Sequence, residues 1–285
     1  MGRDPSEPTD ETVTSTAGPR GGDGGTALYV YGVVPKDTSP KLFAQVRGVD
    51  PSHPVVLVND QEVAAIASPV PLDEFGAGAI ETRLRDPAWL EEKVRAHDAV
   101  LEAALGRAAV LPFRFGTIYL GEQQVREMLA DRPDLARVLT RLGEALELGV
   151  KAVLDRATFR GRLEAGSGLE GEPAASGRAY MERKRVDRNL DEAMGAFAAE
   201  CADISHERLA AAAAEARANP VHRPEVVGSD HVMLLNGAYL VHADQVELFR
   251  STLASLQERY AADGVTYELT GPWPPYNFVE EQEET

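Results

Sequence analysis

The sequence contains almost no cysteine and no long apolar run. Cys201 is the single cysteine among 285 residues, so an internal disulfide is impossible and a reducing compartment is expected. No apolar run approaches the roughly 20 residues that a membrane span requires. Residues 1–25 also lack the apolar centre of a secretory signal peptide. These absences predict a soluble, cytoplasmic protein without membrane contact.

The sequence is also poor in positive charge and in catalytic motifs. The 29 Lys and Arg residues stand against 46 Asp and Glu residues, and the net charge of −17 argues against a general nucleic-acid-binding protein. There is no glycine-rich phosphate loop, no dinucleotide fingerprint and no serine in a nucleophile elbow. Cys201 falls on the apolar stripe of a predicted helix, where a thiolate is disfavoured. We therefore predict a scaffold with no catalytic residue and no cofactor.

The residue pattern in the first half of the chain predicts a disordered tail followed by a small α/β domain. Residues 1–26 have almost nothing apolar to bury, whereas residues 28–34 read as a central strand. A hairpin is expected around Asn59-Asp60, between strands at 55–58 and 63–67. A long loop with one or two short turns is expected at 69–85.

A helix should begin at Asp86-Pro87, as N-cap and first-turn proline, and end at Gly106. His97 lies on its apolar stripe, and we interpret it as a buried, hydrogen-bonded histidine. The next strand, at 109–117, should leave the sheet or keep to an edge at Pro112, with Phe113 and Phe115 on one face and Arg114 on the other. Two short helices, at 122–130 and 133–142, read as a connector.

The second half reads as strand, helix, strand, strand, helix, strand, the βαββαβ order of a ferredoxin-like domain. The expected strands are 146–152, 231–235, 238–242 and 265–270. A mobile loop at 161–177, a long helix capped by Ser176, an alanine-rich helix at 207–218 and a helix begun by Asp244 complete the list. We predict an α+β protein with an N-terminal α/β domain (27–120), a helical connector (121–144), a ferredoxin-like domain (145–279) and an acidic tail (280–285).

Asn236-Gly237 is the clearest local signal, because this pair is preferred in the two-residue turn of a β-hairpin. The resulting register would place His231 opposite His242, next to Asp230 and Asp244. Two polar strand ends are the favoured interpretation, and a metal site is the alternative.

The predicted hairpin is apolar on both faces. Leu234 and Tyr239 would share one face, and Met233 and Leu240 the other. Two helices cover only one face of such a sheet, so the other needs a cover from the first domain, the aromatic tail or a partner protein.

Two further stretches are candidates for contacts. After the last strand, Gly271-Pro272 ends the ladder, and Trp273, Tyr276 and Phe278 follow on a stiff segment that must pack on the core or on a partner. A basic cluster opens the long helix, at Arg178, Arg183, Lys184, Arg185 and Arg188. Interleaved acidic residues favour a solvated helix face, and a docking site for an acidic segment, such as residues 280–284, is the alternative.

These motifs together resemble the gas vesicle accessory proteins of the GvpF/GvpL family over about residues 27–279. The resemblance is carried by Leu28-Tyr29-Val30-Tyr31-Gly32-Val33-Val34, His97 with Val100, Leu111-Pro112-Phe113-Arg114-Phe115-Gly116-Thr117, Gly177-Arg178-Ala179-Tyr180-Met181 and Gly271-Pro272-Trp273-Pro274-Pro275-Tyr276-Asn277-Phe278. The chain departs from the family pattern at Ala179, where an acidic residue is common, and in its long N-terminal tail.

The resemblance implies an assembly or minor structural protein of gas vesicles, the hollow protein-walled organelles that give buoyancy. It implies a gas-vesicle-associated location and, as partners, the small hydrophobic shell protein and other accessory proteins. The candidate interaction residues are Arg114, Arg183, Lys184, Arg185, Leu234, Tyr239, Trp273, Tyr276 and Phe278. Two alternatives are a small-molecule-sensing regulatory module and a metal-dependent enzyme using His231 and His242. The oligomeric state is left open.

Overall fold

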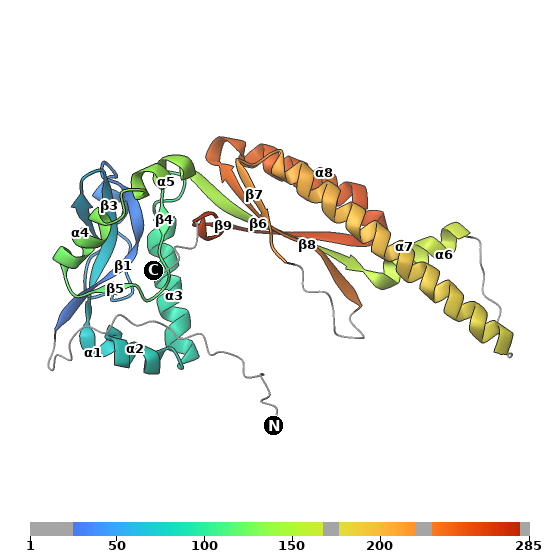
Figure 1. The fold of residues 1–285 in the computed structure, drawn as a ribbon, viewed down its shortest axis with the longest axis horizontal. Helices are drawn as coiled ribbons and strands as arrows, with labels where there is room; N and C mark the ends of the chain where they lie inside the picture. The colour runs from blue at the N-terminus through green and yellow to red at the C-terminus, as the bar shows by residue number, and fades with distance from the viewer. Residues whose placement is uncertain (1–24, 168–176, 221–229, 280–285) are drawn as a thin grey trace, which may run out of the picture.

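The computed structural model describes residues 25–167, 177–220 and 230–279, in which two antiparallel β-sheets follow one another along the long axis (Figure 1). The predicted N-terminal tail, except for residues 25 and 26, and the acidic tail 280–285 lie outside these residues. The first sheet has the order β2-β3-β1-β4, and β5 also pairs with β1. Its strands are β1 (Thr26–Pro35), β2 (Val56–Asp60), β3 (Val63–Pro71), β4 (Leu111–Pro112) and β5 (Ile118–Tyr119).

Helices cover both faces of the first sheet because β1 is apolar on both sides. Tyr29 and Tyr31 pack with Leu101 on one face, whereas Val30 and Val33 pack with α4 and α5 on the other. The helices of this part are α1 (Leu72–Phe75), α2 (Ala77–Arg83), α3 (Pro87–Glu102), α4 (Glu122–Ala130) and α5 (Leu135–Leu142), and a 3₁₀ turn covers Pro40–Leu42.

Several local predictions for this part are confirmed. The Asp86 carboxylate accepts hydrogen bonds from the backbone N–H groups of Ala88 (3.1 Å) and Trp89 (3.4 Å), as an N-cap should. The β2–β3 hairpin also forms. Its turn is at Gln61-Glu62, two residues later than predicted, because Asn59 and Asp60 pair with Ala64 and Val63 in the ladder.

Two predictions for the first part are wrong. The expected loop at 69–85 holds the end of β3, α1 and α2. Phe113 and Phe115 do not share a face: Phe113 packs with the α4–α5 side and Phe115 with the α3 side. The chain leaves the sheet after Pro112, as that proline allows, so strand alternation does not apply beyond it.

The second sheet has the order β7-β8-β6-β9, and α7 and α8 run side by side over one of its faces (Figure 1). Its strands are β6 (Ala145–Asp155), β7 (Glu215–Ala218), β8 (His231–His242) and β9 (Val265–Trp273). The helices are α6 (Arg156–Ser167), α7 (Gly177–Ala210) and α8 (Val246–Tyr260), with 3₁₀ turns at Ala243–Gln245, Ala261–Asp263 and Tyr276–Phe278.

The predicted Asn236-Gly237 hairpin is wrong, because both residues lie inside the single strand β8. Asn236 pairs with Lys151 and Gly237 with Val150. A turn there would leave half of the long strand β6 without a partner, so the ladder outweighs the local turn preference. Gly237 serves another purpose: a Cβ at this position would lie 2.6 Å from the Tyr239 ring, so only glycine leaves room for that side chain.

Two segments of the second part also differ from their prediction. The alanine-rich stretch at 207–218 is not a helix of its own: α7 continues to Ala210, and β7 occupies Glu215–Ala218. Part of the loop expected at 161–177 is the end of α6, and residues 168–176 lie outside the described part.

The apolar core between the two sheets joins both parts of the chain. Leu135, Leu139 and Leu142 of α5 share one buried cluster with Val30 and Val33 of β1. Ala238 and Leu240 of β8 and the ring of Phe278 belong to the same cluster. Within the described ranges, no helix combines the length and apolarity needed to cross a bilayer.

Candidate protein-interaction site

The last residues that the structure describes, 271–279, cross from the second sheet to the first part of the protein; we call them the C-terminal strap. At its start, Gly271 has φ +99°, and a Cβ there would lie 2.7 Å from the carbonyl oxygen of Glu147. The pairing of β9 with β6 shifts register here, so Trp273 stands opposite Glu147. The ladder thus continues to Trp273, past the Gly271-Pro272 pair that was predicted to end it, and the prediction is wrong on this point.

Glu147 anchors the strap at the sheet. Its carboxylate accepts hydrogen bonds from the backbone N–H (2.9 Å) and the side-chain amide (2.5 Å) of Asn277. The side chain is only 5% exposed, and desolvation raises its pKa although both Asn277 bonds and Arg217 oppose the shift. A buried carboxylate needs such donors, so the sheet and the strap are held to each other.

Phe278 anchors the strap at the junction of the two parts. Its ring is fully buried in the cluster that contains Ala238 and Leu240. The guanidinium of Arg217 lies 5.5 Å from the ring centroid, a cation–π distance. Arg141 of α5 donates to the Phe278 carbonyl (2.7 Å) and also to both carboxylate oxygens of Glu215 in β7 (2.6 and 2.8 Å).

Tyr276 connects the strap to α3. Its hydroxyl lies 3.1 Å from Nε2 of His97 and donates to Oδ1 of Asp98 at 3.3 Å. Nδ1 of His97 lies 2.9 Å from the hydroxyl of Tyr29, whose oxygen accepts the N–H of Gly116 at 3.0 Å. The tautomer of His97 determines which of its ring nitrogens donates, because each tyrosine hydroxyl can donate or accept.

The charges in this chain of contacts follow from burial. Desolvation lowers the pKa of His97 to about 4, although a backbone hydrogen bond to Phe113 opposes the shift. His97 is therefore neutral at neutral pH. Desolvation also raises the pKa of Asp98 and of Tyr276. The prediction of a buried, hydrogen-bonded histidine is confirmed, since His97 is 1% exposed.

The strap exposes two aromatic side chains although it is anchored at both ends. Trp273 is 41% exposed and Tyr276 is 39% exposed. Phe278, which was predicted as an interaction residue together with these two, is instead fully buried in the core. A tryptophan and a tyrosine on a rigid, well-anchored segment are the residue types that contribute most to protein–protein contacts.

Leu234 and Tyr239 do not form a surface. Both belong to the buried cluster under α7 and α8, with exposures of 7% and 0%, and the Tyr239 hydroxyl lies 3.0 Å from Nδ1 of His206. The expectation that these two residues contact a partner is therefore corrected. Tyr239 shares the helix side with Leu235 by strand alternation, whereas Leu234 reaches the same side because the ladder with β6 shifts register between Met233 and Leu235.

The other face of the second sheet is divided in two. Next to the first part, Leu240 and Ala238 are covered by the shared cluster and Phe278. Farther out, the neighbours across the strands include Lys151, Asn236 and Glu268, which is a polar set. The chain itself thus supplies the apolar cover predicted for this face.

The metal-site alternative is contradicted by the geometry of β8. His231 and His242 stand at the two ends of one strand of 12 residues, more than about 30 Å apart at roughly 3.3 Å per residue. They cannot share an ion. In the described ranges, no group of three or more His, Cys, Asp or Glu side chains could hold a metal.

The remaining predicted residues are not brought together with the strap. Arg114 is exposed in the turn between β4 and β5. Arg183, Lys184 and Arg185 lie in α7, and their side chains fall outside the described part. The anchors Glu147, Asn277 and Arg141 were not predicted, because alternation along β6 made Glu147 an ordinary outward residue and its partner lies 130 positions away.

The comparisons with known proteins agree with this architecture. A family model described as gas vesicle synthesis protein GvpL/GvpF matches residues 27–280. Gas vesicle protein L of Streptomyces sp. (strain CB03234) is 34% identical, over 88% of this chain and 92% of its own length. Gas vesicle protein F of the same strain is 30% identical, over 89% of this chain and all of its own. The crystal structure of GvpF from Anabaena sp. PCC7120 matches with a TM-score of 0.63 at 18% identity, over 90% and 96% of the two chains.

Proposed function

The chain belongs to the GvpL/GvpF family of gas vesicle synthesis proteins, and from this we propose that it is a non-enzymatic accessory or minor structural protein of gas vesicle assembly. In this role it binds the small hydrophobic shell protein, or other accessory proteins, while the vesicle wall is being nucleated. It acts in the cytoplasm, in association with the vesicle. The observation that carries the proposal is the exposed Trp273–Tyr276 pair on the anchored strap.

The proposed architecture has a first domain (27–120), a helical connector (121–144) and a ferredoxin-like second domain (145–279). Support comes from the strand order β7-β8-β6-β9, in which all neighbours are antiparallel and both long helices lie on one face. The connector also contributes to the first domain, since α4 and α5 cover one face of its sheet.

The strap suits a hydrophobic partner for a physical reason. Trp273 and Tyr276 offer large apolar area, and the bonds of Asn277 and Tyr276 already restrict the segment before any partner arrives. A preordered surface loses little conformational entropy on binding, so more of the contact energy appears as affinity. The Trp273 side chain is free of hydrogen-bond partners among the described residues, so its replacement leaves the anchors intact.

The test is a pull-down of the shell protein by the full chain after co-expression. Trp273→Ser should lower the amount of shell protein retained several-fold, because it removes a large exposed aromatic side chain. Leu248→Ser is the matched control: Leu248 is 53% exposed on α8, away from the strap, and its replacement should leave retention unchanged.

Both variants should keep the wild-type melting temperature, since neither residue is part of the core. Wild-type retention by Trp273→Ser, or an equal loss in both variants, would count against the strap as the contact surface. Absence of shell protein from the wild-type pull-down would refute the proposed partner.

A further inference from the structure

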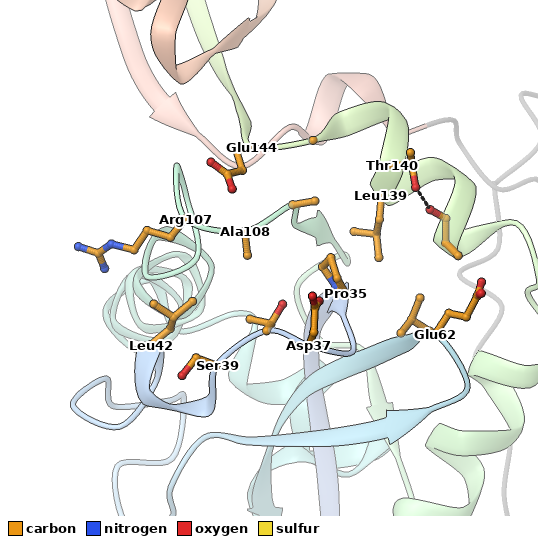
Figure 2. A pocket seen from close by; sticks show the side chains of 15 residues that line it. Pro35, Asp37, Ser39, Leu42, Glu62, Arg107, Ala108, Leu139, Thr140 and Glu144 are labelled. Atoms are coloured by element: carbon orange, nitrogen blue, oxygen red, sulfur yellow. Dashed lines mark hydrogen bonds between the residues drawn. The ribbon is translucent and has the colours of Figure 1, made fainter.

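A cavity of about 670 Å³ opens between the first sheet and the link from α5 to β6 (Figure 2). It lies apart from the Trp273–Tyr276 surface, and the two proposals do not depend on each other. Its wall is mixed: Leu42, Val63, Ala108 and Leu139 supply an apolar part, and Thr38, Ser39 and Thr140 lie beside them. A cavity of this size holds several side chains and is far larger than an ion or a water needs.

Three carboxylates border this cavity. Asp37 and Glu62 come from the strand ends of the first sheet, and Glu144 comes from the opposite side, just before β6 (Figure 2). None of the ion pairs or hydrogen bonds between described side chains uses these three carboxylates. Arg107, the only basic residue of the lining, turns its guanidinium away from the cavity and toward the carbonyl of Ala103.

We propose that this acidic cleft binds a basic amphipathic peptide segment of a partner protein. Apolar side chains of the segment enter the cavity, while its Lys or Arg residues pair with Asp37, Glu62 and Glu144. An apolar part of the wall next to an unpaired negative rim favours this chemistry, since a purely apolar segment would leave the carboxylates unmatched. The acidic tail of this chain, residues 280–284, has the wrong sign of charge to occupy it.

The position of the cleft gives the contact a consequence. Asp37 follows β1 and Glu62 lies in the turn between β2 and β3, whereas Glu144 precedes the first strand of the second sheet. A segment bound to all three therefore bridges the two parts of the chain. Binding should restrict their relative movement, because a ligand that contacts both parts stabilises the arrangement it fits.

The test measures binding of a fluorescent helical peptide of leucine and lysine, with all leucines on one face, to the full chain at low salt. The variant Asp37→Asn/Glu62→Gln/Glu144→Gln should bind about tenfold more weakly, because three individually weak charge pairs are lost together. The matched control, Asp203→Asn/Glu247→Gln/Glu258→Gln, removes the same charge from exposed positions on α7 and α8 and should bind within about twofold of wild type.

A second variant tests the apolar part of the site. Ala108→Trp places an indole in the cavity and should abolish peptide binding without loss of net charge. Equal weakening by the cleft and control triple variants, or full binding by Ala108→Trp with an unchanged melting temperature, would overturn the proposal. So would spermidine, a cation with no apolar face, competing as strongly as the peptide. A doubled molecular mass that the cleft variant abolishes would assign the cleft to a second copy of this chain instead.

Discussion

Replacing Phe278 with alanine should uncouple the two parts of the protein. The ring is fully buried in the cluster that joins β1, α5 and β8, and it also lies under Arg217. Truncation of a buried phenylalanine to alanine costs about 3–5 kcal/mol. We expect the upper part of this range, because the cavity lies between elements of two sheets and Arg217 loses its ring contact, worth about 0.5–1 kcal/mol. The whole free energy of unfolding of a domain is only about 5–15 kcal/mol.

The two tryptophans allow the loss to be measured in each part separately. Trp89 lies in α3 and Trp273 at the end of β9, so Trp89→Phe and Trp273→Phe each leave one fluorescent reporter. In urea, the wild-type background should give coincident transitions. With Phe278→Ala, the midpoint should fall for both reporters, and the two transitions should separate because the shared cluster no longer connects the sheets.

Leu248→Ala serves as the control, since this side chain is 53% exposed and its loss should change the free energy of unfolding by less than about 0.5 kcal/mol. A Phe278→Ala protein with a loss below about 1 kcal/mol and coincident transitions would refute the reasoning. Such a result would mean that the hydrogen bonds of Arg141 and Asn277 hold the strap in place without the Phe278 ring.

Acid should destabilise the protein through His97, whose folded pKa of about 4 lies below its ordinary value of 6.5. The unfolded chain binds the proton first, so this contribution is complete above about pH 6.5 and is lost as the pH falls toward 4, by up to about 3 kcal/mol. Glu147 and Asp98 have a raised pKa, so their protonation favours the folded state as the pH falls and opposes the effect of His97. The variant His97→Gln should therefore show a smaller fall in melting temperature than the wild type between pH 6.5 and 5. An unchanged slope would contradict the assignment to His97. In β8, Gly237→Ala should cost about 1–3 kcal/mol because its Cβ meets the Tyr239 ring, whereas Asn236→Thr should change the stability by less than about 0.5 kcal/mol. Thermal melts distinguish the two readings: a large loss from Asn236→Thr is the result that a hairpin turn would give.

Features with a local cause could be predicted from the sequence. Asp86-Pro87 begins α3 because the cap is made by atoms two and three residues away. The apolar run at 28–34 had to be a buried strand, and His97 on an apolar stripe had to find partners inside. The strap could be singled out as a proline-stiffened aromatic segment. Its anchors could not be predicted, because Glu147 and Asn277 meet across 130 residues.

The wrong prediction of a turn at Asn236-Gly237 had a larger effect than any error in the predicted ends of helices and strands, since it changed which side chains were expected to reach solvent. As one strand with a register shift at Leu234, β8 turns Leu234 and Tyr239 toward the helices and places Ala238 and Leu240 under the first part of the chain. The apolar surface that suggested a partner is therefore largely used in folding.

What remains accessible lies at the boundary of that covered region, where Trp273 stands opposite Glu147 and Tyr276 reaches α3. These two side chains extend from a backbone that Gly271, Asn277 and Phe278 fix on both sides. The same contacts that join the two parts of the chain thus hold in place the two most exposed aromatic side chains among the described residues. The affinity of a partner for Trp273 and Tyr276 should therefore depend on how firmly the strap is held at the junction of the two parts. Phe278→Ala loosens the strap and should weaken that binding, even though Phe278 itself is buried.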